Sequence, residues 1–203
     1  MSSMHLDKYS KALYRSSTVG ISDKQKAATK NKEAFKLKAW LDEQGCAFFN
    51  KHIAVHMRAW WAFLQKQYPT IAKDMEDKVP RKYWLSRTPF TKVTVAMNNP
   101  TPVHFDDKNY GLTFLVSFEV GDEGSLVGGS HCIFCMQGGA ALVVQDSGRG
   151  TTIVGDYRRL LHANLATSRG RRLVVTCYTS KYIVDLSCSG REGAHACSTP
   201  FWN

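Results

Sequence analysis

The amino-acid sequence predicts an α+β fold in which a helical N-terminal layer packs on an antiparallel β-sandwich or barrel. Between residues 31 and 67, apolar residues recur at helical spacing. After residue 90, short β-rich runs alternate with clusters of Gly, Asp, Asn and Ser. The composition of the 203 residues, 43% hydrophobic and 22% charged, is that of a globular protein. A chain of this length can bury a substantial core.

The first 30 residues are polar and basic, show no sustained periodicity, and are predicted to form a loose N-terminal arm. Residues 1–40 hold nine lysines and arginines against three acids, a local charge of +6 within a total of +10. Such an excess favours a polyanionic partner, because binding to phosphates releases counterions. A basic arm that only keeps the protein soluble is the alternative.

The helical layer is expected over residues 31–88. Phe49, Ile53, Met57, Trp61 and Leu64 follow one another at spacings of four, four, four and three, which places them on one helix face. Gly45 is expected to separate two helices. The stretch "QYPTIAKDMEDKVPRKYW" then predicts a turn, a short helix and an exit at Pro80.

The tryptophan-rich part of this layer is expected to cover the sheet. Alternatively, some of its aromatic residues, together with Arg81, Lys82 and Arg87, line a groove for nucleic acid.

The β core is expected over residues 90–185. Its runs are rich in β-branched and aromatic residues, and they read "FTKVTVAMNN", "YGLTFLVSFEV", "SHCIFCM", "AALVVQD", "GTTIVGDY" and "RRLVVTCYTSKYIV". The tail beyond them is expected to be irregular. Residues 31–203 are therefore predicted to form a single domain behind the arm of residues 1–30.

The chain shows no features of a membrane or secreted protein. No segment reaches the roughly 18–20 apolar residues that span a bilayer, and the N-terminus lacks the apolar core of a secretory signal. The six cysteines are accordingly expected to be reduced thiols. These features predict an intracellular monomer, nuclear if the source is a eukaryote.

One short stretch, "TPVHFDDKNYG", suggests a metal site. His104 and Asp106 are two residues apart, so in an extended strand their side chains project from the same face. His162 follows in "RRLLHANL", at the edge of another β-run. Two imidazoles and one carboxylate form the facial triad of non-haem iron(II) oxygenases, which leaves positions open for a bidentate co-substrate and dioxygen.

A keto-acid co-substrate also needs a cation for its distal carboxylate. Arg172 opens the strand after His162 and can form a bidentate pair with a carboxylate. Arg171 is expected to point to the opposite face, and Arg169 to lie in the turn.

With these motifs, residues 90–185 resemble the iron(II)- and 2-oxoglutarate-dependent dioxygenases with a double-stranded β-helix (jelly-roll) core. Within them the chain is most similar to the TET/JBP group, which oxidises the methyl group of 5-methylcytosine or thymine in DNA. The resemblance lies in "VHFDDKN", "LLHANL" and "RRLVVTCYTSK".

The resemblance implies a role for each matched residue. His104, Asp106 and His162 would bind and use the metal, and Arg172 would hold the co-substrate. Asn109 would hydrogen-bond the flipped base, and Tyr178 would stack on that base.

Two positions depart from the group's pattern. Val174 stands where part of the group has a hydroxyl residue that helps to hold the co-substrate, so 2-oxoglutarate and ascorbate both remain open. Ser180 stands where some members have a histidine that contacts the base, which weakens the case for 5-methylcytosine.

The leading hypothesis is therefore an iron(II)-dependent dioxygenase that uses O2 to hydroxylate the methyl group of a flipped-out modified base. The base expected is 5-methylcytosine in duplex DNA, with RNA as the other nucleic acid. The alternative within oxygenases is a 2-oxoglutarate-dependent hydroxylase or demethylase of a protein, RNA or small molecule. A non-catalytic binding module is a third hypothesis, disfavoured by the intact triad.

Two other groups of residues have metal-ligand spacing. Cys132 and Cys135 could bind zinc only with two further ligands, for which Cys188, His195 and Cys197 in the tail are available. Ordinary strand packing is the alternative. His52 and His56 lie four apart, but "HIAVH" has no glutamate beside the first histidine, so a metalloprotease is not expected.

Overall fold

The computed structural model describes residues 15–20, 47, 49–120, 126–135, 141–145 and 149–189. The chain divides into two compact units. The described residues of the first lie within Met1–Thr18, Val93–Asp107 and Leu112–Cys177. Those of the second lie within Val19–Lys92, Lys108–Gly111 and Tyr178–Asn203. Expectations for Gly45, the rest of the arm and the tail beyond residue 189 fall outside the described residues.

The second unit contains the helices. A π-helical turn, η2 (Phe49–Ile53), continues into α3 (Ala54–Gln67), and α4 (Pro69–Lys78) begins on a proline, which suits the first helical position. The apolar face predicted from the spacing is confirmed, since all five of its residues are buried and two are fully so: Phe49, Ile53, Met57, Trp61 and Leu64. The predicted exit at Pro80 is also confirmed, because α4 ends at Lys78 and a 3-10 turn, η3, begins at Arg81.

The end of the chain corrects one prediction. The run "RRLVVTCYTSKYIV" was expected to remain extended to residue 185, but the strand ends at Ser180 and α5 (Lys181–Ser189) follows. Short apolar runs such as "YIV" fit a strand or a helix equally well. Here Ile183 and Val184 are both fully buried, and Lys181 forms an ion pair with Asp185 one helical turn on, at 2.7 Å.

A five-stranded sheet has the order β1-β2-β11-β4-β8. Its strands are β1 (Arg15–Gly20), β2 (Lys92–Met97), β11 (Arg172–Ser180), β4 (Asn109–Glu119) and β8 (Arg149–Gly155). Strand β1 corrects the prediction of a wholly loose arm. An edge strand is held by backbone hydrogen bonds, which require no apolar pattern in the sequence.

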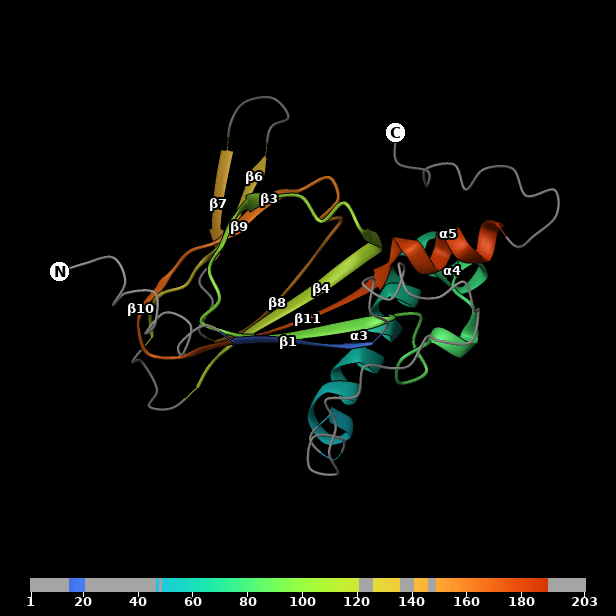
Figure 1. Cartoon of the computed structure of the whole chain (residues 1–203), viewed down its shortest axis with the longest axis horizontal. Coiled ribbons are helices and arrows are strands. Elements are labelled where there is room, and N and C mark those ends of the chain that lie inside the picture. Colours follow the sequence, from blue (N-terminus) through green and yellow to red (C-terminus); the bar gives the residue numbers. More distant parts are fainter. Residues whose placement is uncertain are drawn as a thin grey trace, which may run out of the picture. The chain divides into compact units, whose positions relative to one another are not determined.

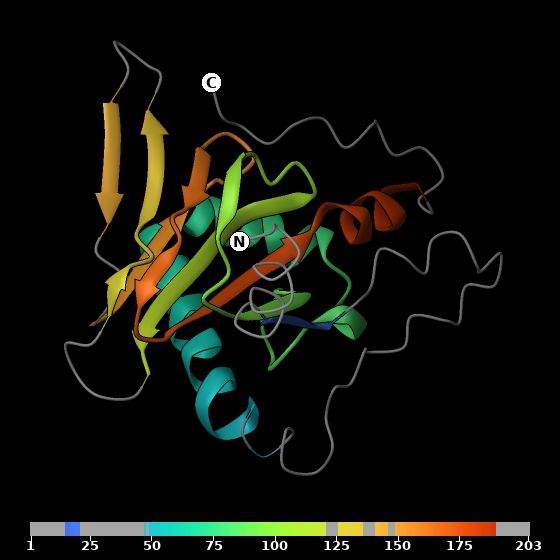
Figure 2. The same ribbon diagram turned by 60° about the vertical axis from the view of Figure 1, so that its left-hand side comes forward.

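A four-stranded sheet in the first unit has the order β3-β9-β6-β7. Its strands are β3 (Thr101–His104), β9 (Leu161–Asn164), β6 (His131–Cys135) and β7 (Ala141–Gln145). A further ribbon pairs β5 (Val127–Gly128) with β10 (Thr167–Arg169). Figures 1 and 2 show β6 and β7 running side by side as the outer hairpin of this sheet.

The central strands explain why the β core holds together. Strand β4 is buried from Asn109 to Ser117, and Phe114 and Val116 are at most 4% exposed. Within β11, Val174, Val175 and Cys177 are buried as well. The predicted fold class is therefore confirmed as α+β, with antiparallel sheets of the double-stranded β-helix type.

The cysteine prediction is wrong at one position. Cys132 and Cys177 are free, buried thiols, whereas Cys188 is disulfide-bonded. Burial in apolar surroundings raises the pKa of the Cys177 thiol, so this side chain is an inert part of the core. Among the described residues, no helix combines the length and the apolar character needed to cross a membrane.

Candidate metal centre

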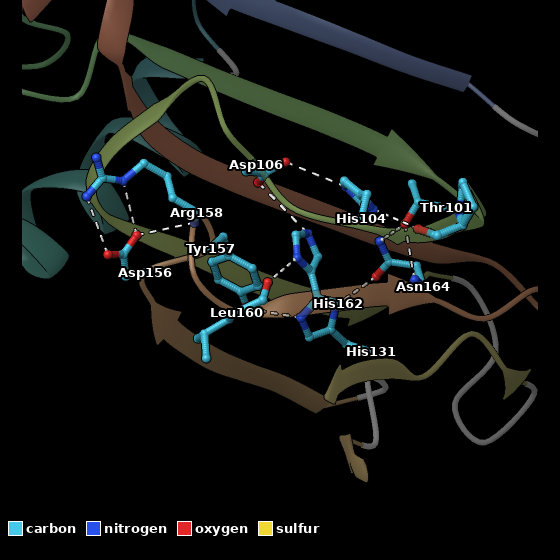
Figure 3. A network of polar contacts seen from close by, with 11 residues as sticks. Thr101, His104, Asp106, His131, Asp156, Tyr157, Arg158, Leu160, His162 and Asn164 are labelled. Atoms are coloured by element: carbon cyan, nitrogen blue, oxygen red, sulfur yellow. Dashed lines mark hydrogen bonds and ion pairs between the residues drawn. The ribbon is translucent and has the colours of Figure 1, made fainter. Parts of the chain in front are cut away.

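The register of β3 and β9 brings the three predicted ligands together. The strands are antiparallel, and His104 lies directly opposite His162. Their ring centroids are 4.2 Å apart. Asp106 lies just beyond the end of β3, with Oδ1 3.5 Å from His104 Nε2 and Oδ2 3.9 Å from His162 Nε2. One ligand atom from each residue lies within 4.8 Å of the others, as a shared metal ion requires (Figure 3).

Hydrogen bonds orient both imidazoles. His104 Nδ1 lies 2.7 Å from the carbonyl oxygen of Pro102, and His162 Nδ1 lies 2.9 Å from that of Leu160. A carbonyl only accepts, so each Nδ1 carries the proton and donates it. In the neutral imidazole, each Nε2 then carries the lone pair and faces Asp106. An outer hydrogen bond prepares a histidine to ligate a metal in this way.

The carboxylate is positioned through the backbone. The Asp106 N–H donates to the carbonyl of Tyr157 at 2.9 Å. That carbonyl is itself fixed, because Tyr157 lies in a turn in which the N–H groups of Arg159 and Leu160 both donate to the carbonyl of Asp156. Through the Tyr157 carbonyl this turn fixes the backbone of Asp106. The same turn leads directly into β9, which carries His162.

Burial keeps His162 neutral. Its side chain is 5% exposed, and removal from water lowers the pKa of His162 below the usual value of 6.5. The Leu160 hydrogen bond and the negative Asp106 oppose this shift, and His104 adds to it. A neutral imidazole is the form that binds metal, so the site is ready to take an ion near neutral pH.

A hydrogen-bonded chain of four residues lies beside the triad. The Tyr157 hydroxyl is 3.0 Å from His131 Nε2, and His131 Nδ1 is 3.0 Å from Asn164 Oδ1. The Asn164 amide nitrogen then donates to Thr101 Oγ1 at 2.8 Å (Figure 3). Since Asn164 Oδ1 only accepts, His131 carries its proton on Nδ1 and accepts from Tyr157 at Nε2.

This chain excludes His131 as a fourth ligand, because both of its ring nitrogens already have partners. The His131 ring is nevertheless 5.6 Å from that of His162, and the Tyr157 ring meets His162 edge-on at 4.5 Å. Burial lowers the pKa of His131, against the effect of the Asn164 hydrogen bond; His162 and Arg172 lower it further. The neutral side chains of His131 and Tyr157 thus pack against His162 on one side of the triad.

Arg172, the predicted co-substrate residue, is buried in the same unit as the triad. It is 1% exposed, and its Nε has no hydrogen-bond partner among the described residues. Its backbone is fixed by Asn98, whose Oδ1 accepts the Arg172 N–H at 2.6 Å. Arg171, in contrast, is exposed. The co-substrate role of Arg172 stays a prediction.

A glycine and a threonine accompany the Arg172 side chain. Thr167 Oγ1 is also buried without a described partner. A Cβ built on Gly129 would lie 2.7 Å from Thr167 Oγ1 and 3.5 Å from Arg172 Nε. The absence of a side chain at Gly129 therefore lets the Thr167 hydroxyl and the Arg172 side chain approach its backbone closely.

The two predicted base-binding residues belong to the second unit, and the triad to the first. Asn109 begins β4 and is 5% exposed. Tyr178 lies on β11, partly buried, with the Lys92 ammonium 5.9 Å from the centre of its ring. Their roles stay predictions.

Sequence reasoning missed several residues of the site. Tyr157 and Thr101 follow no recognised spacing, and no signal in the sequence indicates a role for Gly129. Asn164 follows His162 by two residues in "LLHANL", and nothing in that spacing indicates its hydrogen bond to His131. The buried Thr167 hydroxyl beside Gly129 was not foreseen, because Thr167 lies on a different strand from Arg172.

The other two metal hypotheses gain no support within the described residues, where the only cluster of potential ligands is His104, Asp106 and His162. His52 and His56 are both exposed. Cys188 is disulfide-bonded and is not available as a zinc thiolate. His195 and Cys197 lie outside the described residues.

No protein-family model matches the chain, and no curated protein matches it. Among solved structures, NgTET1 in complex with 5mC DNA matches with a TM-score of 0.59 at 14% identity, over 89% of this chain and 67% of that one. This likeness shows a shared fold.

Two other solved structures match less well. A prolyl-4-hydroxylase from Pseudomonas putida has a TM-score of 0.40 at 15% identity, over 60% of this chain. A 2OG-Fe(II) oxygenase family oxidoreductase from Burkholderia pseudomallei has a TM-score of 0.37 at 13% identity, over 45% of this chain. The chain spans 63% and 44% of their respective lengths, and scores this low support no conclusion.

Proposed function

We propose that this protein is an iron(II)-dependent dioxygenase that hydroxylates the methyl group of a modified base, 5-methylcytosine in DNA. The observation that carries the proposal is the cluster of His104, Asp106 and His162, with both Nε2 atoms directed at the carboxylate. Two neutral imidazoles and one carboxylate on one side of an ion are the ligand set of non-haem iron(II) oxygenases.

The residues present fit iron(II). When bound, the metal supplies the activation of dioxygen that hydroxylation of a methyl group requires. The protein contributes orientation, and it excludes water on the His162 side of the site, whereas His104 and Asp106 are about one-third exposed. His162 is almost fully buried, and the Tyr157 and His131 rings close one side of it.

The co-substrate is proposed to be 2-oxoglutarate, held through its distal carboxylate by Arg172. A buried guanidinium Nε without a partner is costly, and a carboxylate would satisfy it. The Thr167 hydroxyl, unpaired at the same glycine, offers the contact that Val174 cannot make. Ascorbate, which also presents adjacent oxygens, is the alternative donor.

The choice of a nucleobase rests on Asn109, Tyr178 and the basic charge of the chain. An asparagine can both donate to and accept from a base edge, and stacking of a base on a tyrosine contributes about 1 to 3 kcal/mol. The fold shared with NgTET1, which was solved with 5mC DNA, agrees with this choice. We propose that residues 31–203 act as one catalytic domain, in a monomer located inside the cell with its DNA.

The test is a nucleoside assay. The protein is loaded anaerobically with iron(II) and exposed to air with a 5-methylcytosine duplex, in separate arms with 2-oxoglutarate and with ascorbate. Mass spectrometry then measures the loss of 5-methylcytosine. Asp106→Ala is the inactive variant. Asp107→Ala is its matched control, because Asp107 is the adjacent, exposed carboxylate outside the triad.

Loss of 5-methylcytosine with the wild type and Asp107→Ala, but not with Asp106→Ala, is the expected result. The arm that supports turnover identifies the co-substrate. If the iron-loaded protein leaves 5-methylcytosine unchanged in both arms, the DNA substrate is wrong. A protein, RNA or small-molecule substrate then replaces it.

A further inference from the structure

The segment Lys78–Lys92 of the second unit, here called the basic segment, concentrates positive charge. It contains five lysines and arginines and no acid: Lys78, Arg81, Lys82, Arg87 and Lys92. Three of them, Arg81, Lys82 and Arg87, are exposed. Among the described residues, no acidic side chain pairs with any of these three, so their charges are available to a partner.

Aromatic rings hold two of these cations in place. The Arg81 guanidinium lies 4.6 Å from the centre of the Trp84 ring, and the Lys82 ammonium lies 4.9 Å from that of Tyr83. Trp84 is itself fixed, because its indole N–H donates to the carbonyl of Val79 at 2.8 Å. Cations anchored over rings lose less conformational freedom when they bind an anion than free side chains do.

Arg87 is presented by a strained turn. Thr88 N–H donates to the carbonyl of Leu85 at 2.9 Å, which closes a two-residue turn over Ser86 and Arg87. Both central residues have positive φ, 52° at Ser86 and 64° at Arg87. Turns of this kind favour Asn-Gly, because other side chains are strained in the left-handed region.

The base of the turn is rigid. Leu85 and Phe90 are buried and joined by a hydrogen bond from the Leu85 N–H to the Phe90 carbonyl at 2.9 Å, and Thr88 is fully buried. The Thr88 hydroxyl donates to the Leu85 carbonyl at 2.7 Å. Packing therefore imposes the strain, and the exposed arginine at the tip gains no described contact in return. A non-glycine residue held under such strain suggests a functional role.

We propose that the basic segment binds the phosphate backbone of duplex DNA, with Arg87 at the tip of the turn and Arg81 and Lys82 beside it. Lys78 is paired with Asp74 at 2.7 Å, but Arg81, Lys82 and Arg87 pair with no described acidic side chain. Exposed cations of this kind suit a regular array of phosphates. A membrane surface is disfavoured, because such surfaces combine cations with exposed apolar anchors. No residue of the basic segment is among the large hydrophobic side chains exposed in the described structure. The choice of DNA rests on the proposed function.

The experiment measures binding of the full-length, metal-free protein to a fluorescent, unmethylated 20-base-pair duplex by anisotropy, at several salt concentrations. Arg87→Gly removes the cation and also relieves the strain. Arg87→Lys keeps the charge. Lys66→Gln is the matched control, because it removes one exposed cation from α3, outside the basic segment. Thermal unfolding is recorded for each variant.

We expect Arg87→Gly to bind about fivefold more weakly and to lower the slope of log K against log salt by about one, as loss of one phosphate contact requires. Its unfolding midpoint should stay equal or rise, because glycine adopts positive φ freely. Arg87→Lys should keep the wild-type slope. The triple variant with Arg81→Gln, Lys82→Gln and Arg87→Gly should lower the slope by about three.

Binding by Arg87→Gly equal to that of Lys66→Gln overturns the proposal, and so does weaker binding that accompanies a lower unfolding midpoint. If Arg87→Gly loses more affinity for an RNA duplex than for the DNA duplex, the choice of DNA is overturned. Binding in this assay needs neither iron nor a methylated base. If the nucleoside assay fails but duplex binding still depends on Arg87 as expected, the result counts against the proposed function and not against the DNA-binding role of the basic segment.

Discussion

Tyr157 is the residue whose contacts connect most of the site. Its carbonyl holds Asp106, its hydroxyl hydrogen-bonds His131, and its ring packs edge-on against His162. The backbone of Tyr157 thus holds Asp106. The Tyr157 side chain contacts two histidines, His131 through the hydroxyl and His162 through the ring. A substitution that removes only the hydroxyl separates these contributions.

Tyr157→Phe removes the hydrogen bond to His131, whose ring lies beside that of His162. Because this bond supports a ligand only indirectly, metal binding is expected to weaken by no more than about tenfold, the lower end for direct partners of ligands. The substitution should also lower the free energy of unfolding by about 1 to 3 kcal/mol, because His131 Nε2 is left buried without a donor. Calorimetric titration with Mn(II) and urea unfolding measure the two effects.

Tyr110→Phe is the matched control for Tyr157→Phe. Tyr110 is another buried tyrosine, whose hydroxyl donates to Asp74 in the second unit. It should lose stability by a similar amount and bind metal like the wild type. Equal metal affinity in both variants would show that the Tyr157 hydroxyl serves only the fold.

At the scale of elements, the glycine that precedes β6 shapes the surroundings of Arg172. Gly129 has φ of 75°, and a Cβ there would meet Thr167 Oγ1 at 2.7 Å. Gly129→Ala should therefore reduce 2-oxoglutarate affinity at least tenfold, by displacing the Thr167 and Arg172 side chains, in addition to the strain of about 1 kcal/mol that alanine suffers at this φ.

Gly150→Ala is the control, since Gly150 has φ of 71° but its Cβ would meet only Phe118, at 3.4 Å. It should lose stability and keep its co-substrate affinity, measured by calorimetry on the metal-loaded protein without oxygen. Equal affinities for the two variants would remove Gly129 and Thr167 from the co-substrate site.

An element was predictable where its buried side chains recur at a regular spacing in the sequence. It was less predictable where the element depends on pairing with other parts of the chain. The apolar face from Phe49 to Leu64 appeared directly in the spacing, because one helix buries one face. Strand β1 did not, because backbone pairing defines it. The change from β11 to α5 was missed because "YIV" is apolar enough for either structure.

The site was predictable to a similar extent. His104 and Asp106 are close in sequence, and their i, i+2 spacing already implies a common face. His162 was found as a histidine on a later strand, and its position opposite His104 confirms that the three lie together. Asn164 and Thr167 reach the site through sheet register, and Tyr157 through the turn before β9. A single sequence specifies neither.

For the whole molecule, the two buried histidines make stability depend on pH. In the folded, metal-free protein the pKa of His131 and of His162 is lowered by burial below 6.5, the unfolded value. Around His131, Asn164 opposes this shift, while His162, Arg172 and His104 add to it. The unfolded chain therefore binds more protons, so the free energy of unfolding falls as pH drops below 6.5.

Urea unfolding of the metal-free protein between pH 7.5 and 5 measures this dependence. His131→Asn should reduce it, whereas His56→Gln, which removes an exposed histidine of α3, should not. A wild-type stability that stays constant or rises on acidification would contradict the buried, neutral state of these imidazoles.

The claim on which the function depends is that His104, Asp106 and His162 bind one metal ion. Anaerobic calorimetric titration with iron(II), on the wild type, Asp106→Ala and Asp107→Ala, tests it most directly. We expect one equivalent to bind to the wild type and to Asp107→Ala, with affinity reduced at least a hundredfold in Asp106→Ala. Wild-type affinity in Asp106→Ala, or equal losses in both variants, would contradict the metal centre and the dioxygenase built on it.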